Sequence, residues 1–558
     1  MDIALPLTED RTPVRTGRCW VDAVLTAAVA ALSLAFFYRF QIAQGFTHLF
    51  GDRYDGMIEI AIMQHWGNVL AGKEAWNTTA YFHPAADTLG YNDGYLLYGM
   101  IHAAGRAMGL SLLGAAELTH AAMKLAGFFG MLALLRRCCA VGKEWSLFGA
   151  ALFTVADLTL QHANHGQLFT VAFVPWAALL AWRAGEALIA RRRAATLAWG
   201  AGFAALFALW ISTAFYLAWF FGLYLLLLSG AAFVMSGRAG MRGLGAALWQ
   251  CRAPIIAIAG MGIFLLTPFL LVYLPKMAET GAHGYGAVGW TSFTLFDYVN
   301  VVPGNIVWGA PVQWLRETIL PGLQAHRDRI FGMPLLLFLL ALGAAWRQVR
   351  DRKDGPAYAW IGAALLLSWL LIFNLFGFSL WRIIHATIPG ASGIRVLGRF
   401  NILLLVPAIM LVTMMLARMP RRTLALTLAA LLLGEQVSLT APVQLDKAEQ
   451  LAMIAAIPAP PPACRAFAVT STRPHGYAPL DPEGDRIYAH NVDAMVLAQW
   501  FARPTVNGVS TFNPPHWDFA DPDAPDYRAR IRRYAHITGL SGLCDLDVRR
   551  GRFWTPIG

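Results

Sequence analysis

Residues 51–93 read GDRYDGMIEIAIMQHWGNVLAGKEAWNTTAYFHPAADTLGYND, and the interpretation of the whole chain starts from this stretch. It follows the first long apolar segment and is rich in acids and imidazoles: Asp52, Asp55, Glu59, His65, His83 and Asp93. Such density is unusual in a chain of which only 14% of the residues are charged. A long loop of this kind beside a membrane is where chemistry on a membrane-bound substrate is expected. An ordinary solvated loop is the alternative on composition alone.

The composition is that of an integral membrane protein. Of the 558 residues, 57% are hydrophobic, and the mean hydropathy is +0.50. Soluble proteins carry about 25% charged residues, well above the fraction found here. The net charge of +11 does not indicate a nucleic-acid partner, because the basic residues form short clusters between apolar spans, as in loops that face anionic lipid. Residues 1–20 are polar, so we expect no cleavable signal peptide and a first span that serves as an uncleaved anchor.

Eleven apolar segments approach or reach the roughly 17–25 residues that a membrane span needs. They lie at about 21–43, 115–135, 145–161, 167–185, 195–211, 213–235, 254–275, 331–347, 357–378, 398–417 and 423–440. The basic clusters all fall on one side of the membrane if the segment 95–113 does not cross. This segment contains His102 and Arg106, and we expect it to form a re-entrant or interfacial helix. The predicted fold class is therefore an α-helical polytopic membrane protein with a cytoplasmic N-terminus and an outer C-terminus.

This topology places every candidate site on the outer face. The outer segments are the loop 44–114, the turn QHANHGQ at 161–167, the loop 276–330, the loop 379–397 and the tail from 441. The loop 276–330 is interpreted as cover for the outer face, or as a lid over a lipid cavity. The inner loops hold little besides basic residues, and we expect the midpoints of the spans to be free of charge.

A helix is expected within the first outer loop, where apolar residues follow helical spacing at Met57, Ile60, Ile62 and Trp66. We expect its apolar face to rest on the membrane surface. Asp52 and Asp55 come just ahead of its first turn. Because a helix N-terminus favours anions, both carboxylates would be ionised and able to accept a proton or bind a cation. Either acid taken alone is also explained as an N-cap.

The tail 441–558 is interpreted as a small α/β domain outside the membrane. Its apolar runs are short, with a candidate strand at 467–471 and a candidate helix at 492–501. Of the six cysteines, the topology places only Cys464 and Cys544 outside. In an oxidising compartment these two would form a disulfide that ties the first strand of the domain to its end.

Cationic side chains on the outer face complement the acids. Arg395 and Arg399 lie in IPGASGIRVLGRF at 388–400, where a lipid phosphate head group is a natural partner and snorkelling toward the interface is the alternative. An acid acting as base, with Arg or His stabilising a departing phosphate, suffices for glycosyl transfer from a polyprenyl-phosphate sugar. The candidate catalytic residues are Asp52 and Asp55, and the candidate substrate-binding residues are His83, Asp93, His162, His165, Gln167, Arg395 and Arg399.

The order of these motifs resembles bacterial membrane proteins of the GT-C glycosyltransferase superfamily. The resemblance is carried by GDRYD, YFHP, LGYND, HANHGQ and PGASGIRVLGRF, and RPTVNGVS at 503–510 is similar to a stretch in members with a small outer C-terminal domain. It implies a polyprenyl-phosphate-linked donor and a catalytic acid in the first outer loop, a position that Asp52 matches. His83 and Pro84 are similar to the HP of protein mannosyltransferases, although Ala85 replaces the second proline found there. The DD or DE pair of better-known members is absent, since Arg53 follows Asp52.

The resemblance further implies inverting transfer to a glycan, lipid or protein acceptor at the bacterial cytoplasmic membrane. Some members bind Mg or Mn through such acids and others need none, so no residue is assigned to a metal. Two rival functions remain. A transporter or flippase of lipid-linked envelope precursors would carry ionisable residues near the bilayer midplane. A non-catalytic partner in envelope assembly would tolerate loss of Asp52. No nucleic acid is expected as a partner.

Overall fold

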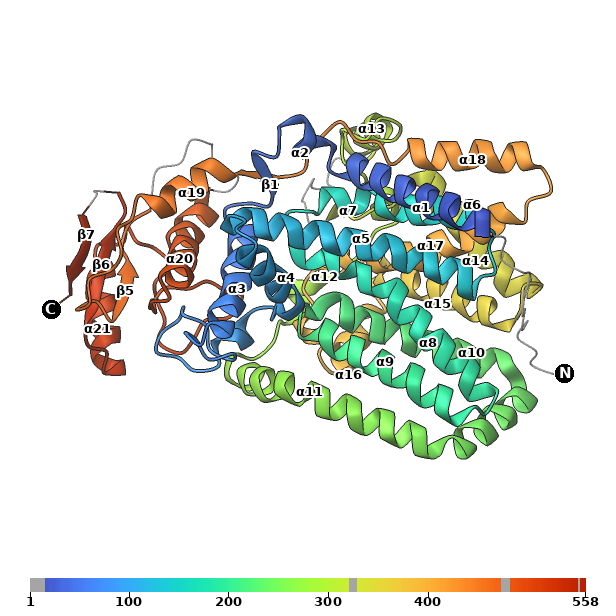
Figure 1. Ribbon diagram of the computed structural model, residues 1–558, viewed down its shortest axis with the longest axis horizontal. Helices are drawn as coiled ribbons and strands as arrows, with labels where there is room; N and C mark the ends of the chain where they lie inside the picture. The colour runs from blue at the N-terminus through green and yellow to red at the C-terminus, as the bar shows by residue number, and fades with distance from the viewer. Residues whose placement is uncertain (1–15, 321–328, 473–481, 550–551, 558) are drawn as a thin grey trace.

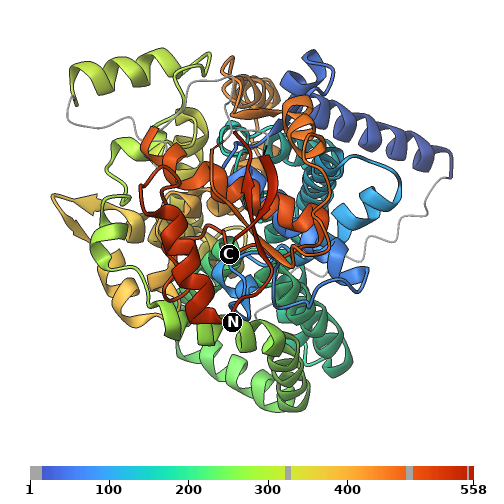
Figure 2. The ribbon, with the colours of Figure 1, turned by 90° about the vertical axis from the view of Figure 1, so that its left-hand side faces the viewer.

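Long helices run side by side along the long axis of the molecule, and a small α/β domain covers one end of them (Figures 1 and 2). The computed structural model describes residues 16–320, 329–472, 482–549 and 552–557. The expected N-terminal tail therefore lies mostly outside the described residues, as does part of the loop 276–330. What is described of that loop contains α12 (Tyr285–Gly289), η3 (Phe296–Val299) and α13 (Gly309–Thr318). Its role as cover or lid stays a prediction.

Each predicted span coincides with a helix. These helices are α1 (Thr16–Phe37), α5 (Leu112–Cys138), α6 (Lys143–Thr154), α8 (Phe173–Ile189), α9 (Arg193–Ile211), α10 (Phe215–Gln250), α11 (Arg252–Thr280), α14 (Leu335–Asp351), α15 (Pro356–Ile372), α17 (Arg399–Ala417) and α18 (Arg422–Gly434). Within the described residues, seven segments are long and apolar enough to cross a membrane, and α15 and α18 are shorter apolar helices. The chain is thus a mostly helical protein with several membrane spans, as predicted.

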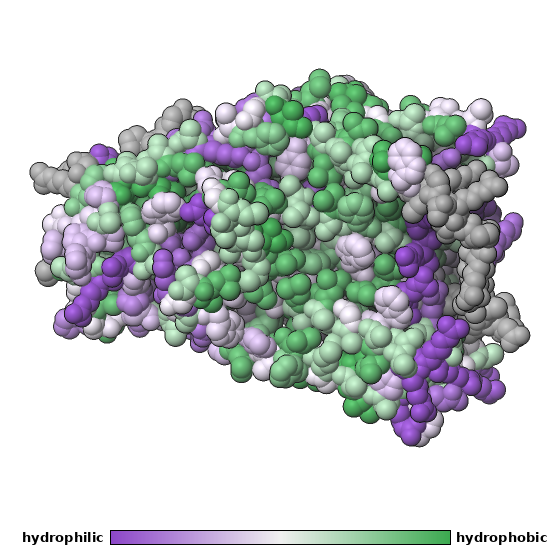
Figure 3. Space-filling view, in the orientation of Figure 1, coloured by the Kyte–Doolittle hydropathy of each residue, from purple (hydrophilic) through white to green (hydrophobic). Residues whose placement is uncertain are grey.

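The two ends of the bundle differ in chemistry. The basic linkers that join α5 to α6, α10 to α11 and α14 to α15 lie at the end opposite the α/β domain (Figure 1). The surface there is hydrophilic, whereas the middle of the bundle is largely hydrophobic (Figure 3). The segment 95–113 forms α4 (Leu96–Ala107), which is too short to cross a bilayer and packs against α3 (Asp55–Leu70) at the α/β-domain end.

The helix α3 is covered by protein, so the expectation that it rests on the membrane surface is wrong. Met57, Ile60, Ile62 and Trp66 are at most 7% exposed. Protein surrounds the helix, with α4 and α20 (Pro482–Phe501) packed against it. Ile58 and the polar Glu59 and Asn68, which lie outside the predicted apolar face, are also buried, so protein encloses more than one side of the helix.

The expectation of span midpoints without ionisable residues is wrong at α5, which carries the buried side chain of Lys124. Its ammonium donates to the Thr154 carbonyl oxygen at 3.2 Å and to Thr159 Oγ1 at 2.7 Å. It also lies 3.7 Å from the centre of the Phe37 ring. These contacts compensate for the loss of water around the charge.

The first outer loop and the tail are joined by strand pairing. Strand β1 (His48–Phe50) pairs antiparallel with β4 (Gln444–Asp446), so the start of the loop lies beside the start of the tail. Further along the tail, β5 (Ala466–Val469) pairs parallel with β6 (Leu543–Asp547), and β7 (Arg552–Pro556) pairs antiparallel with β6. With α19 (Lys447–Ala455), α20 and α21 (Tyr527–Thr538) these strands form the expected α/β domain.

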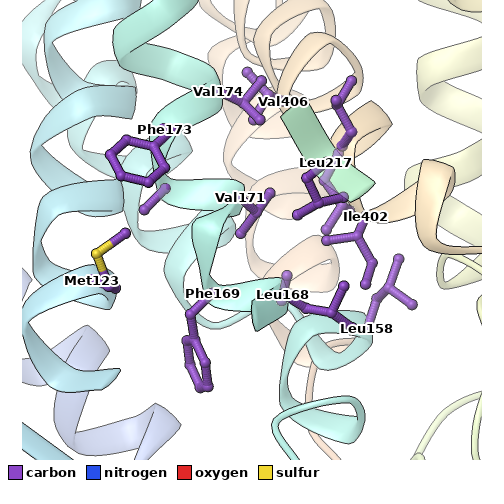
Figure 4. Packing of buried hydrophobic residues seen from close by; sticks show 14 of the residues in the cluster. Met123, Leu158, Leu168, Phe169, Val171, Phe173, Val174, Leu217, Ile402 and Val406 are labelled. Atoms are coloured by element: carbon purple, nitrogen blue, oxygen red, sulfur yellow. The ribbon is translucent and has the colours of Figure 1, made fainter. Parts of the chain in front are cut away.

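The turn 161–167 is anchored by apolar side chains that follow it. It connects α7 (Asp157–Gln161) to η2 (Gly166–Ala172), and Leu168 and Val171 of η2 point into the core shared with α10 and α17 (Figure 4). Leu217 of α10 and Ile402 of α17 meet them there (Figure 4). The polar turn therefore sits on a close-packed floor, which limits its movement.

Cys464 and Cys544 form the predicted disulfide, which closes a loop of 80 residues within the tail domain. We expect Cys544→Ala to lower the free energy of unfolding of the domain by about 2–4 kcal/mol, because the unfolded chain gains freedom when the link is lost. Limited proteolysis of the tail, with Cys251→Ala as a control at a free cysteine, measures the effect. Identical gel mobility of the wild type with and without reductant would contradict the link.

Candidate functional site

Asp52 lies between β1 and α3, and both oxygens of its carboxylate accept hydrogen bonds from the protein. Its Oδ1 accepts hydrogen bonds from the backbone N–H of Tyr54 at 3.0 Å and of Gly56 at 3.1 Å, and its Oδ2 accepts one from Asn164 Nδ2 at 3.1 Å. The residue is 8% exposed. Burial raises the pKa of its carboxyl, and the neighbouring Asp55 carboxylate adds to the rise. Asp52 thus fixes the start of α3 and ties it to the turn 161–167.

Asp55, the first residue of α3, is the accessible carboxylate. Its side chain is 49% exposed, and its Oδ2 lies 3.1 Å from Nδ1 of His165. Desolvation by the surrounding protein acts to raise the pKa of Asp55, but the contact with His165 and the positive charges of Arg399 and Arg395 outweigh it and lower the pKa overall. Asp55 is therefore an ionised carboxylate beside an imidazole, open on one side.

Arg399 supplies a buried positive charge next to this pair. It is the first residue of α17, is 7% exposed, and its guanidinium lies 4.7 Å from the centre of the Tyr216 ring. Its Nε has no hydrogen-bond partner among the described residues. The Tyr216 hydroxyl in turn accepts a hydrogen bond from the backbone N–H of Arg395, whose side chain is exposed. A cation at a helix N-terminus is unfavourable by itself, so this arrangement is suited to an anion that both would bind.

Asp93 stands on the other side of Arg399. Its Oδ1 accepts a hydrogen bond from the backbone N–H of Phe215, the first residue of α10, at 2.7 Å. Burial raises the pKa of Asp93 to about 6, although the Phe215 bond and the charge of Arg399 act in the opposite direction. The structure thus brings Asp55, Asp93, His165 and Arg399 together from four separate segments of the chain.

The remaining candidates have different surroundings. Gln167 Oε1 accepts a hydrogen bond from the Tyr95 hydroxyl at 3.3 Å. His162 is 7% exposed, its Nε2 lies 2.7 Å from the Ile330 carbonyl oxygen, and its ring stacks on Phe331 at 3.7 Å. His162 thus holds the segment that follows the long outer loop.

His83 lies at the junction with the tail domain. Its backbone N–H donates to the Thr505 carbonyl oxygen at 2.9 Å, and that of Phe82 donates to Asn507 at the same distance. The Thr505 N–H returns a hydrogen bond to Ala80 at 2.7 Å. Burial lowers the pKa of the half-buried His83 imidazole. His83, a predicted site residue, therefore lies where backbone hydrogen bonds join the tail domain to the first outer loop.

Sequence reasoning missed Asn164 and the pair formed by Glu59 and His120. Glu59 Oε1 lies 2.7 Å from His120 Nε2, and both side chains are at most 4% exposed. The Glu59 carboxylate also packs directly against the turn 161–167 at Gly166. A side chain at this position would overlap the carboxylate, because a Cβ there would lie 2.1 Å from its oxygens. The sequence offered two signals for this pair: Glu59 is an acid among the apolar residues of α3, and His120 is an imidazole inside an apolar span.

Arg53, which follows Asp52, points away from it into the tail domain. Its Nη2 lies 3.1 Å from Oδ2 of Asp493 on α20, and the two side chains are 1% and 3% exposed. Nearby, Asn68 of α3 donates to the Gln499 carbonyl oxygen at 2.8 Å. The departure from the DD or DE pattern therefore has a structural reason, since Arg53 binds a domain and not a ligand.

Among the described residues, no group of three or more His, Cys, Asp or Glu side chains is placed to hold a metal ion. Asp52 and Asp55 lie close together, but the Asp52 carboxylate already accepts three hydrogen bonds from protein donors. Its oxygens are therefore largely occupied. The positive charge of the site is supplied by Arg399 and Arg395, and the His165 imidazole lies beside Asp55.

No protein-family model matches the chain, and no curated protein matches it. Among the solved structures that are similar to it are two cryo-EM structures of the arabinofuranosyltransferase AftD from mycobacteria, one of them a mutant. The first is 15% identical with a TM-score of 0.45 and covers 81% of this chain and 30% of its own. The second is 14% identical with a TM-score of 0.44 and covers 81% and 31%.

The chain thus spans less than a third of the length of AftD. Both neighbours are structures of a glycosyltransferase. TM-scores this low carry no inference about mechanism, which has to rest on the residues of the site.

We predict that Asp493→Ala destabilises the contact between α3 and α20 by about 3–5 kcal/mol, because Arg53 stays buried without its carboxylate. The double variant Arg53→Met, Asp493→Leu should recover most of the loss, since an apolar pair of similar volume needs no compensation. Thermal unfolding of the purified variants measures both effects. Asp526→Ala, which removes an exposed partner of Arg530, serves as the control and should change little. Equal stability of Asp493→Ala and the wild type would refute the role of the pair.

Asp93 gives a pH test of the same site. The folded protein holds the Asp93 proton more tightly than the unfolded chain, so stability falls as the pH rises from about 4 to about 6 and the cost persists above that. Asp93→Asn keeps an acceptor for the Phe215 N–H and carries no charge. We expect it to match the wild type near pH 4 and to exceed it at pH 7 by up to about 3 kcal/mol. Thermal unfolding at both pH values measures the difference, and a pH-independent difference would contradict the prediction.

Proposed function

We propose that this protein transfers a sugar from a polyprenyl-phosphate-linked donor to an acceptor hydroxyl at the outer face of the membrane. The observation that carries the proposal is the convergence of the Asp55 and His165 pair with the buried Arg399 at the N-terminus of α17. A base and an anion-binding group side by side are what glycosyl transfer from a phosphate ester requires.

In the proposed reaction the acceptor oxygen attacks the anomeric carbon of the donor sugar. Asp55 takes the proton of the acceptor hydroxyl as the new carbon–oxygen bond forms. The bond between the anomeric carbon and the phosphate oxygen breaks, and the lipid phosphate leaves with the electron pair. A single displacement of this kind inverts the configuration of the sugar, as expected from the resemblance.

Arg399 binds the donor phosphate and stabilises the charge that grows on it as it leaves. Among the residues that the structure describes, its buried Nε has no hydrogen-bond partner, so it is available to donate to a phosphate oxygen. Arg395 is exposed beside it and adds a second charge for the same head group. No divalent cation is assigned a role, because these groups already neutralise the phosphate.

The proposal assigns Asp52 and Asp55 different roles. The sequence favoured Asp52 as the base by its position. In the structure Asp52 is 8% exposed and accepts three hydrogen bonds, whereas the Asp55 side chain is 49% exposed and faces His165. Asp52 is therefore proposed as a positioning residue that sets the start of α3, and Asp55 as the catalytic base.

Comparison of Asp55→Asn with Asp52→Asn tests this division. We expect Asp55→Asn to lower kcat by a factor of about 10²–10⁴, the usual contribution of a general base. Asp52→Asn keeps an oxygen that accepts from Tyr54 and Gly56, and it should lose less than about tenfold with an unchanged pH profile. The measurement is release of lipid phosphate from polyprenyl-phosphate sugars by purified protein.

Arg399→Lys completes the set and should raise KM for the donor, because a compact ammonium replaces the planar guanidinium. A greater loss in Asp52→Asn than in Asp55→Asn would return the role of base to Asp52. Full turnover by both variants would exclude catalysis by either acid. No turnover of any donor by the wild type would favour the transporter or the non-catalytic envelope partner.

A further inference from the structure

A cavity of about 250 Å³ lies in the tail domain between the segment 516–519 and helix α21. Trp517, Phe519 and Tyr534 line it together with Asp518, Arg530 and Arg533. Its size is close to the lower end of the roughly 300–1,000 Å³ typical of small-molecule sites. None of these residues takes part in the transfer site described above, so the cavity needs its own explanation.

The floor of the cavity is aromatic. The Phe519 ring meets Trp517 edge-on at 5.6 Å and Tyr534 edge-on at 5.2 Å. Phe519 and Tyr534 are at most 4% exposed, so their rings form a fixed apolar surface, while Trp517 is half-buried. Rigid rings of this kind offer a large contact area at little cost in conformational entropy.

The rim of the cavity is polar and carries Arg530, Arg533 and Asp518. Arg530 Nη1 lies 3.1 Å from Asp518 Oδ2, and Arg530 Nε lies 2.9 Å from Asp526 Oδ2. Arg533, exposed on the same helix, also lines the cavity, whereas Asp526 binds Arg530 from outside the lining. Exposed ion pairs add little to stability, so stability does not account for this arrangement. Planar guanidinium and carboxylate groups donate to and accept from neighbouring hydroxyl groups.

A series of ring contacts links the cavity to the transfer site. Trp517 meets Phe82 at 5.8 Å, and Phe82 meets Tyr91 at 5.4 Å, two residues before Asp93. On the other side of the same segment, Phe512 packs on His283 at 5.0 Å. Arg395 is near enough to contribute to the lowered pKa of the His283 imidazole, after burial as the main cause. The segment 512–519 therefore connects the cavity to both the acid side and the cation side of the site.

We propose that this cavity binds a neutral saccharide, and that the saccharide is part of the glycan acceptor. A sugar ring has an apolar face of C–H groups, which fits the aromatic floor, and an edge of hydroxyl groups, which fits the Asp518, Arg530 and Arg533 rim. Arg530 is already paired with the Asp518 and Asp526 carboxylates, which favours a neutral sugar over an acidic one. The role as acceptor rests on the proposed transfer, whereas saccharide binding does not depend on it.

The test is binding of purified full-length protein to immobilised neutral polysaccharides (β-glucan, mannan, galactan and arabinan), with polygalacturonate as an acidic comparison and no donor present. We expect the wild type to bind at least one neutral polymer, and Arg533→Ala and Asp518→Asn to weaken that binding at least tenfold. Arg532→Ala, at an exposed neighbour on α21 outside the cavity, should bind as the wild type does.

Asp55→Asn should also bind fully, since it alters only the transfer step, and this separates failure of the binding proposal from failure of the transfer proposal. Both cavity variants replace exposed side chains, so loss of folding does not obscure the result. Absence of binding to every neutral polymer, binding to the acidic polymer alone, or undiminished binding by both cavity variants would overturn the proposal.

Discussion

A charge taken out of water must be met by an opposite charge, and at Arg53 this requirement holds the structure together. The guanidinium is 1% exposed and its carboxylate partner, Asp493, belongs to another part of the chain. Because Arg53 adjoins Asp52, the ion pair fixes the backbone from which both first-loop acids project. The position of the acids therefore depends on the docking of α20 against α3.

The residues of the proposed transfer site come from separate turns and helix ends of the chain. Asp52 and Asn164 tie α3 to the turn 161–167, and the apolar side chains of η2 fix that turn on the core beneath. Arg399 and Asp93 stand at the starts of α17 and α10, so two helix ends face the same small volume. Rigid helices thus position Arg399 and Asp93, which make few hydrogen bonds to the protein themselves. A site that binds an anionic ligand requires side chains that are held in place in this way.

The spans, the one-sided basic linkers, the α/β tail and the Cys464–Cys544 disulfide were predictable, because hydrophobic length, charge bias and cysteine placement act locally along the chain. The burial of α3 was not, since its cover comes from α20, more than 400 residues later in sequence. Lys124 escaped prediction for a similar reason, because its partners lie on the two following helices, α6 and α7.

The candidate site was predictable as a set of residues but not as a set of roles. Asp52 and Asp55 look alike in GDRYD, and only the packing shows that one is enclosed by donors and the other is open beside His165. His162 and His165 share one turn, yet His162 stacks on Phe331 and His165 faces Asp55. Roles of this kind depend on long-range contacts that no local pattern encodes.

The pairing of Arg53 with Asp493 also sets an order of events during biosynthesis. The two residues are 440 positions apart, and strand β1 likewise waits for β4. At about 5–20 residues per second, roughly 20 to 90 seconds separate the synthesis of the two partners. During this interval the nascent chain already contains Asp52 and Asp55, but α20, which fixes their position by packing against α3, has not yet been synthesised. The framework of the proposed transfer site is therefore complete only after translation has delivered α20.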